Sequence, residues 1–155
     1  MRAGLRTVRW SGRLETVESR PPIILDGAHN PASAAVVAAY MADVRRRQSG
    51  SRVILVLGMM RDKDHGGVLD HLLPCVDEVI VTQARLTRAA TVQELEALVR
   101  ARGRAAYVCP DPADAIALAR RMAAPDDLIL ITGSLMLVGE AKAILLGCGL
   151  SPLRG

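Results

Sequence analysis

The sequence predicts an α/β fold: a Rossmann-like, three-layer αβα domain around a mostly parallel sheet of about six strands. Short apolar runs alternate five times with longer segments in which apolar residues recur at helical spacing. The connections between these segments are short, as in βαβ units. The run at 53–57 is continuously apolar, which is typical of a strand covered on both faces.

The first expected element is a short strand, because apolar and polar side chains are interspersed over residues 14–18. We place it at an antiparallel edge of the sheet. The other strands are expected at 23–25, 53–57, 76–82, 105–109 and 128–132. The helices are expected at 31–47, 64–73, 91–101, 112–122 and 135–146.

Helix-end signals support these boundaries. Asn30 can cap the first helix, and Pro31 occupies its first position, where a missing N–H does no harm. Thr91 and Glu94 have the spacing of a capping box. We therefore expect one domain over 13–147, preceded by a connecting segment, 1–12, and followed by a flexible tail, 148–155.

Composition narrows the function classes. Half of the 155 residues are hydrophobic, yet there is no Phe, one Trp and two Tyr, so the core must be aliphatic. The net charge of +4 comes from scattered arginines, which fits either solvated helix faces or a phosphate-facing groove. Without a basic stripe interleaved with aromatic side chains, we predict no nucleic-acid partner.

The cysteines and the apolar runs bear on where in the cell the protein is expected. Cys75, Cys109 and Cys148 are odd in number and lack zinc-ligand spacing, so we expect buried free thiols and no metal site. The longest apolar stretch, near 128–137, is too short to span a bilayer, and no signal peptide is apparent. We predict a cytoplasmic protein without a membrane partner.

Polar residues gather where the predicted strands end. In open α/β sheets ligands bind at the carboxyl ends of the strands, so these residues should share one rim. An acid, a His, a Lys, several Arg and a Ser on one rim suit a phosphorylated or carboxylated ligand. The rim residues are Asp26, His29, Asn30, Gly58, Arg61, Asp62, Lys63, Asp64, Thr82, Arg85, Thr87, Arg88, Thr132, Gly133 and Ser134.

Each rim residue also has a purely structural interpretation. Asp26 and Ser134 could serve only as helix or turn caps, although a Ser at a helix start also suits an anion. His29 could be a structural imidazole. The stretch from Asp62 to Asp64 could be a solvated turn with a helix cap, and the 85–88 loop could simply be solvated.

Three common nucleotide and hydrolase motifs are missing. There is no GxxxxGK[ST] phosphate loop, no GxGxxG after a strand and no GxSxG nucleophile elbow. A self-sufficient nucleotide site is therefore not expected within this chain.

Four stretches together resemble the C-terminal domain of folylpolyglutamate synthase/dihydrofolate synthase, in the Mur ligase superfamily. They are Trp10-Ser11-Gly12-Arg13-Leu14-Glu15, Ile24-Leu25-Asp26-Gly27-Ala28-His29-Asn30-Pro31, Gly58-Met59-Met60-Arg61-Asp62-Lys63-Asp64 and Ile131-Thr132-Gly133-Ser134-Leu135. The Asp-Gly-Ala-His-Asn-Pro stretch is the most specific. Ser11 and Met136 depart from the usual Pro and Tyr of that family, and neither change removes a polar ligand group.

The resemblance implies an ATP-dependent ligase that joins L-glutamate to a dihydropteroate or folate carboxylate through an acyl phosphate. It implies that Arg13, Asp26 and Asn30 contact ATP, and that His29 faces the phosphate or the incoming glutamate. It assigns Lys63 and Ser134 to the glutamate or the reacting phosphate.

The same resemblance implies a partner. The phosphate loop and most Mg²⁺ ligands would lie in a larger central domain, joined in cis or acting in trans, and this chain alone would be nearly inactive. Two alternatives stay open: another Mur-type ligase for a cell-wall precursor, or a non-catalytic binding module of the same fold.

Overall fold

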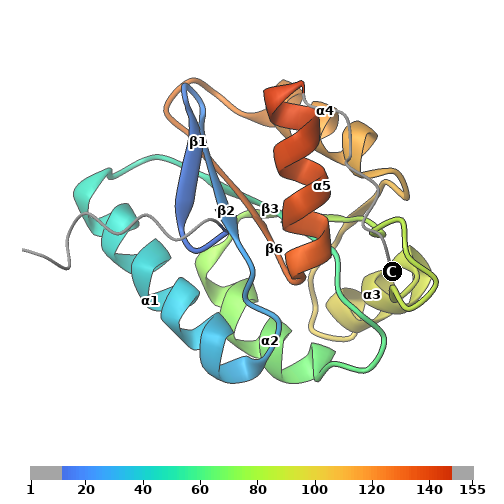
Figure 1. Cartoon of the computed structure of the whole chain (residues 1–155). Helices are drawn as coiled ribbons and strands as arrows, with labels where there is room; N and C mark the ends of the chain where they lie inside the picture. Colours follow the sequence, from blue (N-terminus) through green and yellow to red (C-terminus); the bar gives the residue numbers. More distant parts are fainter. Residues whose placement is uncertain (1–11, 148–155) are drawn as a thin grey trace, which may run out of the picture.

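The computed structural model describes residues 12–147, which form a six-stranded sheet of order β1-β2-β6-β3-β4-β5 (Figure 1). Only β1 runs antiparallel to its neighbour, and every other pairing is parallel. The predicted fold class, including the antiparallel edge strand, is therefore confirmed. The strands are β1 Glu15–Ser19, β2 Pro22–Asp26, β3 Val53–Leu57, β4 Glu78–Val81, β5 Tyr107–Val108 and β6 Leu128–Thr132.

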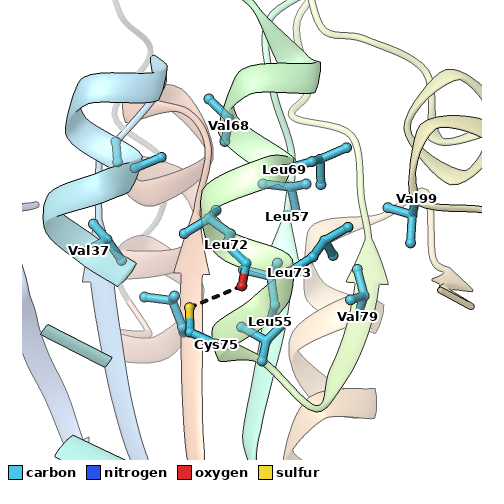
Figure 2. Packing of buried hydrophobic residues seen from close by; sticks show 14 of the residues in the cluster. Val37, Leu55, Leu57, Val68, Leu69, Leu72, Leu73, Cys75, Val79 and Val99 are labelled. Carbon is cyan, nitrogen blue, oxygen red and sulfur yellow. Dashed lines mark hydrogen bonds between the residues drawn. The ribbon is translucent and has the colours of Figure 1, made fainter. Parts of the chain in front are cut away.

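Helices cover both faces of this sheet. Alternate residues of the central strands point to opposite faces, so each strand contributes to two separate apolar clusters. One cluster joins the sheet to α1, α2 and α3, and Figure 2 shows its packing around Leu55 and Leu57. The other joins it to α4 and α5. The helices are α1 Pro31–Arg47, α2 His65–Leu72, α3 Val92–Arg100, α4 Pro112–Met122 and α5 Leu135–Leu146.

The helix-start signals act as expected. Asn30 and Ser33 form a reciprocal capping box at α1, with Pro31 in its first turn. Thr91 and Glu94 form a second capping box at α3. These local hydrogen bonds satisfy backbone N–H groups that have no partner within the helix.

Two strands are shorter than predicted. β4 begins at Glu78, two residues later than predicted, because the Val76 N–H closes the preceding 3₁₀ turn, Leu73–Cys75, on the Leu73 carbonyl. β5 has only two residues because it is the far edge of the sheet and pairs with β4 alone. Its Tyr107 and Val108 are exposed, so this edge adds little to the core.

The cysteine prediction holds for one residue of three. Cys75 is a buried free thiol whose Sγ lies 3.0 Å from the Leu72 carbonyl oxygen (Figure 2). Burial raises the pKa of this thiol, which keeps it protonated. Cys109 is a free thiol but only half-buried, because it follows the exposed edge strand β5. Cys148 lies outside the described residues, as do most of the connecting segment and the whole tail.

Within residues 12–147, no helix has the length and apolar character needed to cross a bilayer. The described residues also contain no group of three or more His, Cys, Asp or Glu side chains that could hold a metal ion.

Asp127 fastens the end of the sheet opposite the rim. Its carboxylate accepts hydrogen bonds from the backbone N–H of Arg52 at 2.8 Å, the backbone N–H of Ala124 at 2.8 Å and the Arg52 guanidinium at 2.9 Å. Burial alone would raise the pKa of Asp127, but these donors outweigh it and hold the pKa below the usual Asp value. The bonds join the starts of β3 and β6.

We expect Asp127→Asn to lower the free energy of unfolding by about 1–2 kcal/mol at pH 7, because an amide has one acceptor oxygen for these donors. A carboxyl with a depressed folded pKa stabilises the protein fully above its unfolded pKa of about 3.9, and this contribution is lost as the pH falls from there through the lower folded pKa. Urea unfolding at pH 7 and pH 3.5 measures both effects. Asp126→Asn, at the exposed neighbouring residue, is the control and should leave the free energy of unfolding unchanged at both pH values. Equal losses for both variants would contradict the stabilising role of Asp127.

Candidate functional site

A pocket of about 380 Å³ lies where β2 ends and α1 begins. We refer to it as the turn pocket. It is formed by the segment before β1, the β2–α1 turn, the first turns of α1 and the start of α5. Its lining residues are Gly12, Arg13, Leu14, Asp26, Gly27, Ala28, His29, Asn30, Ser33, Val36, Val37 and Leu135.

Asp26 holds two walls of the turn pocket together. Its Oδ2 accepts a hydrogen bond from the Leu14 N–H at 2.9 Å, and its Oδ1 accepts one from the Ala28 N–H at 2.8 Å. The residue is 8% exposed. A carboxylate oxygen can accept more than one hydrogen bond, so this arrangement fixes the carboxylate and leaves lone pairs for a ligand hydroxyl. Asp26 is therefore structural and also available for binding.

The segment that carries Arg13 is held in an uncommon conformation. Gly12 has φ +76° and Leu14 has φ +44°, a left-handed value that is rare for a residue with a side chain. The Gly27 N–H donates to the Gly12 carbonyl at 2.7 Å, and Asp26 holds Leu14. These bonds offset the strain and keep the exposed Arg13 at the mouth of the pocket.

His29 is oriented by its own turn. Its Nδ1 lies 2.8 Å from the Gly27 carbonyl oxygen, and a carbonyl only accepts, so Nδ1 carries the hydrogen. In the neutral ring Nε2 is then an acceptor, and in the charged ring it is a second donor. Both forms suit a group on the ligand side of the turn.

Asn30 serves first as a helix cap. Its Oδ1 accepts a hydrogen bond from the Ser33 N–H at 2.9 Å. It also lines the turn pocket, with Ser33 behind it. The four residues that the sequence assigned to the nucleotide, Arg13, Asp26, His29 and Asn30, thus come together in one pocket.

Ser134 and Lys63 do not line the turn pocket. Ser134 is 2% exposed, and its Oγ accepts a hydrogen bond from the Met136 N–H at 3.1 Å as the cap of α5. The Lys63 Nζ lies 3.2 Å from Asp62 Oδ2 on the next loop of the rim. Asp64, beside it, caps α2 through the Gly67 N–H at 2.9 Å. The capping alternatives for Ser134 and Asp64 are therefore real structural roles.

The rim loops nevertheless lie against one another. A methyl group added at Gly67 would come within 2.6 Å of both Pro31 Cγ and Asp64 Oδ2, so the first turn of α2 directly adjoins the first turn of α1. A methyl group at Gly133 would come within 2.5 Å of the Gly58 carbonyl oxygen. These close approaches join the ends of β2, β3 and β6 into one surface.

Two other rim residues turn inward. Thr82 is fully buried, and its hydroxyl donates to the Pro110 carbonyl at 3.3 Å. Thr132 is also buried, and its hydroxyl donates to the Ala28 carbonyl at 3.5 Å. Both therefore stabilise the rim loops and offer no side-chain group to a ligand.

Sequence reasoning missed the apolar part of the pocket. Val36 and Leu135 line it and are 64% and 59% exposed, although both are large hydrophobic residues. For Val36 a signal existed, because it lies off the helical stripe of α1 that contacts the core. Leu135 follows the α5 cap directly, and nothing in its local sequence separates it from core leucines.

Comparison with known proteins gives a consistent family. The family described as Mur ligase, glutamate ligase domain, matches residues 12–135. A probable bifunctional folylpolyglutamate synthase/dihydropteroate synthase of Haloferax volcanii is 37% identical over 140 residues, covering 90% of this chain and 16% of the relative. A dihydrofolate synthase/folylpolyglutamate synthase of Mycobacterium tuberculosis is 34% identical over 160 residues, covering 93% and 32%.

Solved structures agree. A Yersinia pestis bifunctional folylpolyglutamate synthase/dihydrofolate synthase complexed with AMPPNP and a Mn ion superimposes with a TM-score of 0.83 at 30% identity, covering 92% of this chain and 33% of that one. Mycobacterium tuberculosis folylpolyglutamate synthase complexed with ADP and AMPPCP gives 0.81 at 32% identity, covering 90% and 33%.

The chain therefore spans at most about a third of the length of these relatives. The family match extends from the start of the turn pocket to the first residue of α5. The chain belongs to the Mur ligase family as a glutamate ligase domain, the C-terminal domain of folylpolyglutamate/dihydrofolate synthase homologues.

Proposed function

We propose that this chain is the closing domain of an ATP-dependent ligase that adds L-glutamate to a dihydropteroate or folate carboxylate. The observation that carries the proposal is the turn pocket, which gathers Arg13, Asp26 and His29 at the carboxyl end of β2. That end of an open α/β sheet is where ligands bind. The homologous Yersinia pestis and Mycobacterium tuberculosis enzymes have been solved with ATP analogues, which supports a nucleotide as the ligand.

The turn pocket offers complementary groups for each part of the nucleotide. The fixed Asp26 carboxylate would accept hydrogen bonds from ribose hydroxyls. Val36 and Leu135 would pack against the base, and the planar Arg13 guanidinium would stack on it or pair with a phosphate. His29 lies on the side of the turn where the phosphates would extend, with Nε2 available in either protonation state.

The reaction that we propose proceeds through an acyl phosphate. The carboxylate of the acceptor attacks the terminal phosphate of ATP, ADP leaves, and the glutamate amine then displaces phosphate from the acyl group. Charge that moves between the phosphoryl oxygens is stabilised by positioned donors more than by covalent catalysis. His29 would supply such a donor through Nε2 when its ring is charged, and we propose that Lys63 and the α5 start at Ser134 face the glutamate or the phosphate.

Closure would also exclude water. An acyl phosphate is hydrolysed readily, so a second domain that seals the site protects the intermediate. The described residues contain no metal-ligand cluster of their own. We propose that the phosphate loop and most of the Mg²⁺ ligands belong to a central domain, in cis or in trans.

We expect the isolated chain to show no glutamate-dependent ATP hydrolysis, because it lacks a phosphate loop that would hold the β- and γ-phosphates. A coupled ADP-release assay with ATP, L-glutamate and dihydropteroate checks this. Turnover at the rate of a complete ligase would contradict the proposal that a second domain supplies the phosphate loop.

Amide NMR signals of Leu14 and Ala28 should shift when AMPPNP is added, because both N–H groups donate to Asp26. Unshifted signals at millimolar AMPPNP would contradict nucleotide binding.

A further inference from the structure

A second pocket lies further along the rim, between the β3–α2 and β4–α3 loops. It has a volume of about 470 Å³ and is lined by Arg61, Asp62, Thr87 and Arg88. We refer to it as the arginine pocket. None of the nucleotide roles proposed above uses these four residues.

The two loops of the arginine pocket are fastened to each other. The Arg61 N–H donates to the Arg88 carbonyl at 2.8 Å, and the Ala90 N–H donates to the Met59 carbonyl at 2.9 Å. An isolated antiparallel bridge pairs Met60 with Ala89. This short ribbon places the two arginines on adjacent backbone positions, so their separation is set by main-chain bonds.

A buried carboxylate on the neighbouring helix holds the same loop. The Glu140 side chain of α5 is almost fully buried, and its Oε1 accepts a hydrogen bond from the Arg85 N–H at 2.8 Å. The Arg85 guanidinium pairs with Asp111 at 2.7 Å. The loop that carries Thr87 and Arg88 is thus fixed at its start by α5 and α4 and at its end by the ribbon.

The guanidinium groups of the pocket remain available for a ligand. Arg61 has a 59% exposed side chain, and its nearest acidic atom, Glu94 Oε1, is 3.9 Å away, too far for a hydrogen bond. Within the described residues, Arg88 forms no salt bridge or side-chain hydrogen bond. Asp62 is the one acid in the lining; it pairs with Lys63, and that pairing, with a contribution from Arg88, lowers its pKa.

The arginine pocket lies at the same edge of the sheet as the turn pocket. β3 lies two strand positions from β2, across β6, and neighbouring strands are about 4.8 Å apart. The path along the rim runs from the turn pocket through Pro31 and Asp64 to Arg61. The arginine pocket therefore lies on the same rim as the turn pocket, about two strand spacings away from it.

We propose that the arginine pocket binds the carboxylates of a glutamyl tail on the acceptor substrate. This inference rests on the proposed ligase function. Each glutamate added through its amine carries two carboxylates; one receives the next glutamate, and the other remains charged. An acceptor that already carries glutamyl units therefore presents a row of carboxylates, which two arginines and a hydroxyl on adjacent loops would hold by charge-assisted hydrogen bonds.

The test is a titration of this chain with tri-γ-glutamate in 50 mM NaCl without nucleotide. NMR and calorimetry monitor the binding. We expect the amide signals of Arg61, Thr87 and Arg88 to shift, and Arg61→Gln and Arg88→Gln each to weaken binding roughly fivefold, as for exposed ion pairs. Asp62→Asn should tighten binding, because it removes the one negative charge in the lining. Arg46→Gln, at an exposed arginine at the end of α1, should leave the affinity unchanged.

Several results would overturn the inference. One is equal affinity of wild type and both arginine variants; another is tighter binding of free L-glutamate than of tri-γ-glutamate, which would assign the pocket to the incoming amino acid. Absence of any shift at millimolar tri-γ-glutamate would also overturn it. AMPPNP titration of the same samples separates this failure from failure of the ligase proposal, because nucleotide binding would move Leu14 and Ala28 instead.

Discussion

Gly133→Ala is expected to lower the free energy of unfolding by at least about 3 kcal/mol, the range of the most damaging single substitutions. Gly133 has φ +109°, a backbone conformation that side chains disfavour. A methyl group there would also come within 2.5 Å of the Gly58 carbonyl oxygen and 2.8 Å of Leu57 Cδ1. The carbonyl belongs to the neighbouring loop of the rim and cannot rotate away, so the two loops must separate. Urea unfolding, with the slope compared between variants, measures the loss.

Gly139→Ala, in the helix that follows Gly133, is the matched control. Gly139 lies inside α5 with open space around it, so an added methyl group meets nothing within 4 Å. Alanine favours the helix, and we expect a gain of about 0.5–1 kcal/mol. A Gly133→Ala protein as stable as wild type would show that the contact between the β3 and β6 loops does not hold the rim together.

Asp26→Ala is expected to lower the free energy of unfolding by about 2–4 kcal/mol, because two backbone N–H groups lose a charged acceptor in a buried place. These groups are those of Leu14 and Ala28, at 2.9 and 2.8 Å. Without Asp26, the left-handed Leu14 also loses the bond that offsets its strain. Asp26→Asn should cost less, since the amide oxygen still accepts one of the two bonds. Equal losses for Ala and Asn would contradict this account.

Arg13→Ala separates binding from stability at the same pocket. Arg13 is exposed, so its loss should change the free energy of unfolding by less than about 0.5 kcal/mol. If the turn pocket binds nucleotide, the same change should weaken AMPPNP binding. Loss of stability without loss of binding would reverse the roles that we assign to Arg13 and Asp26.

Much of the fold follows from local patterns in the sequence. Caps at Asn30 and Thr91 mark helix starts that the structure confirms. The strand order does not follow from such patterns. The last strand, β6, lies between β2 and β3. Its apolar run, Leu-Ile-Leu-Ile, indicates a buried strand but does not identify the neighbouring strands. Pairing depends on which strand edges are left open, and that is a property of the assembled sheet.

Part of the candidate site also follows from local sequence, and part depends on the assembled fold. Asp26, His29 and Asn30 were predicted because one turn carries all three, and local sequence is sufficient to place them together. Arg13 is brought to the turn by Asp26 and Gly27 from a separate segment, and only the family resemblance indicated it. Exposed apolar side chains on the pocket wall could not be separated from core residues by residue type alone.

The most direct test of the ligase proposal is a chimera in which residues 12–147 replace the matching C-terminal third of the Yersinia pestis folylpolyglutamate synthase/dihydrofolate synthase. Joining the two parts in one chain ensures a high effective concentration of the closing domain. The measurement is incorporation of labelled L-glutamate into dihydropteroate with ATP, compared with the same enzyme truncated before this domain. We expect the chimera to incorporate label and the truncated enzyme to incorporate none. A chimera that unfolds cooperatively yet incorporates no more label than the truncated enzyme would contradict the account.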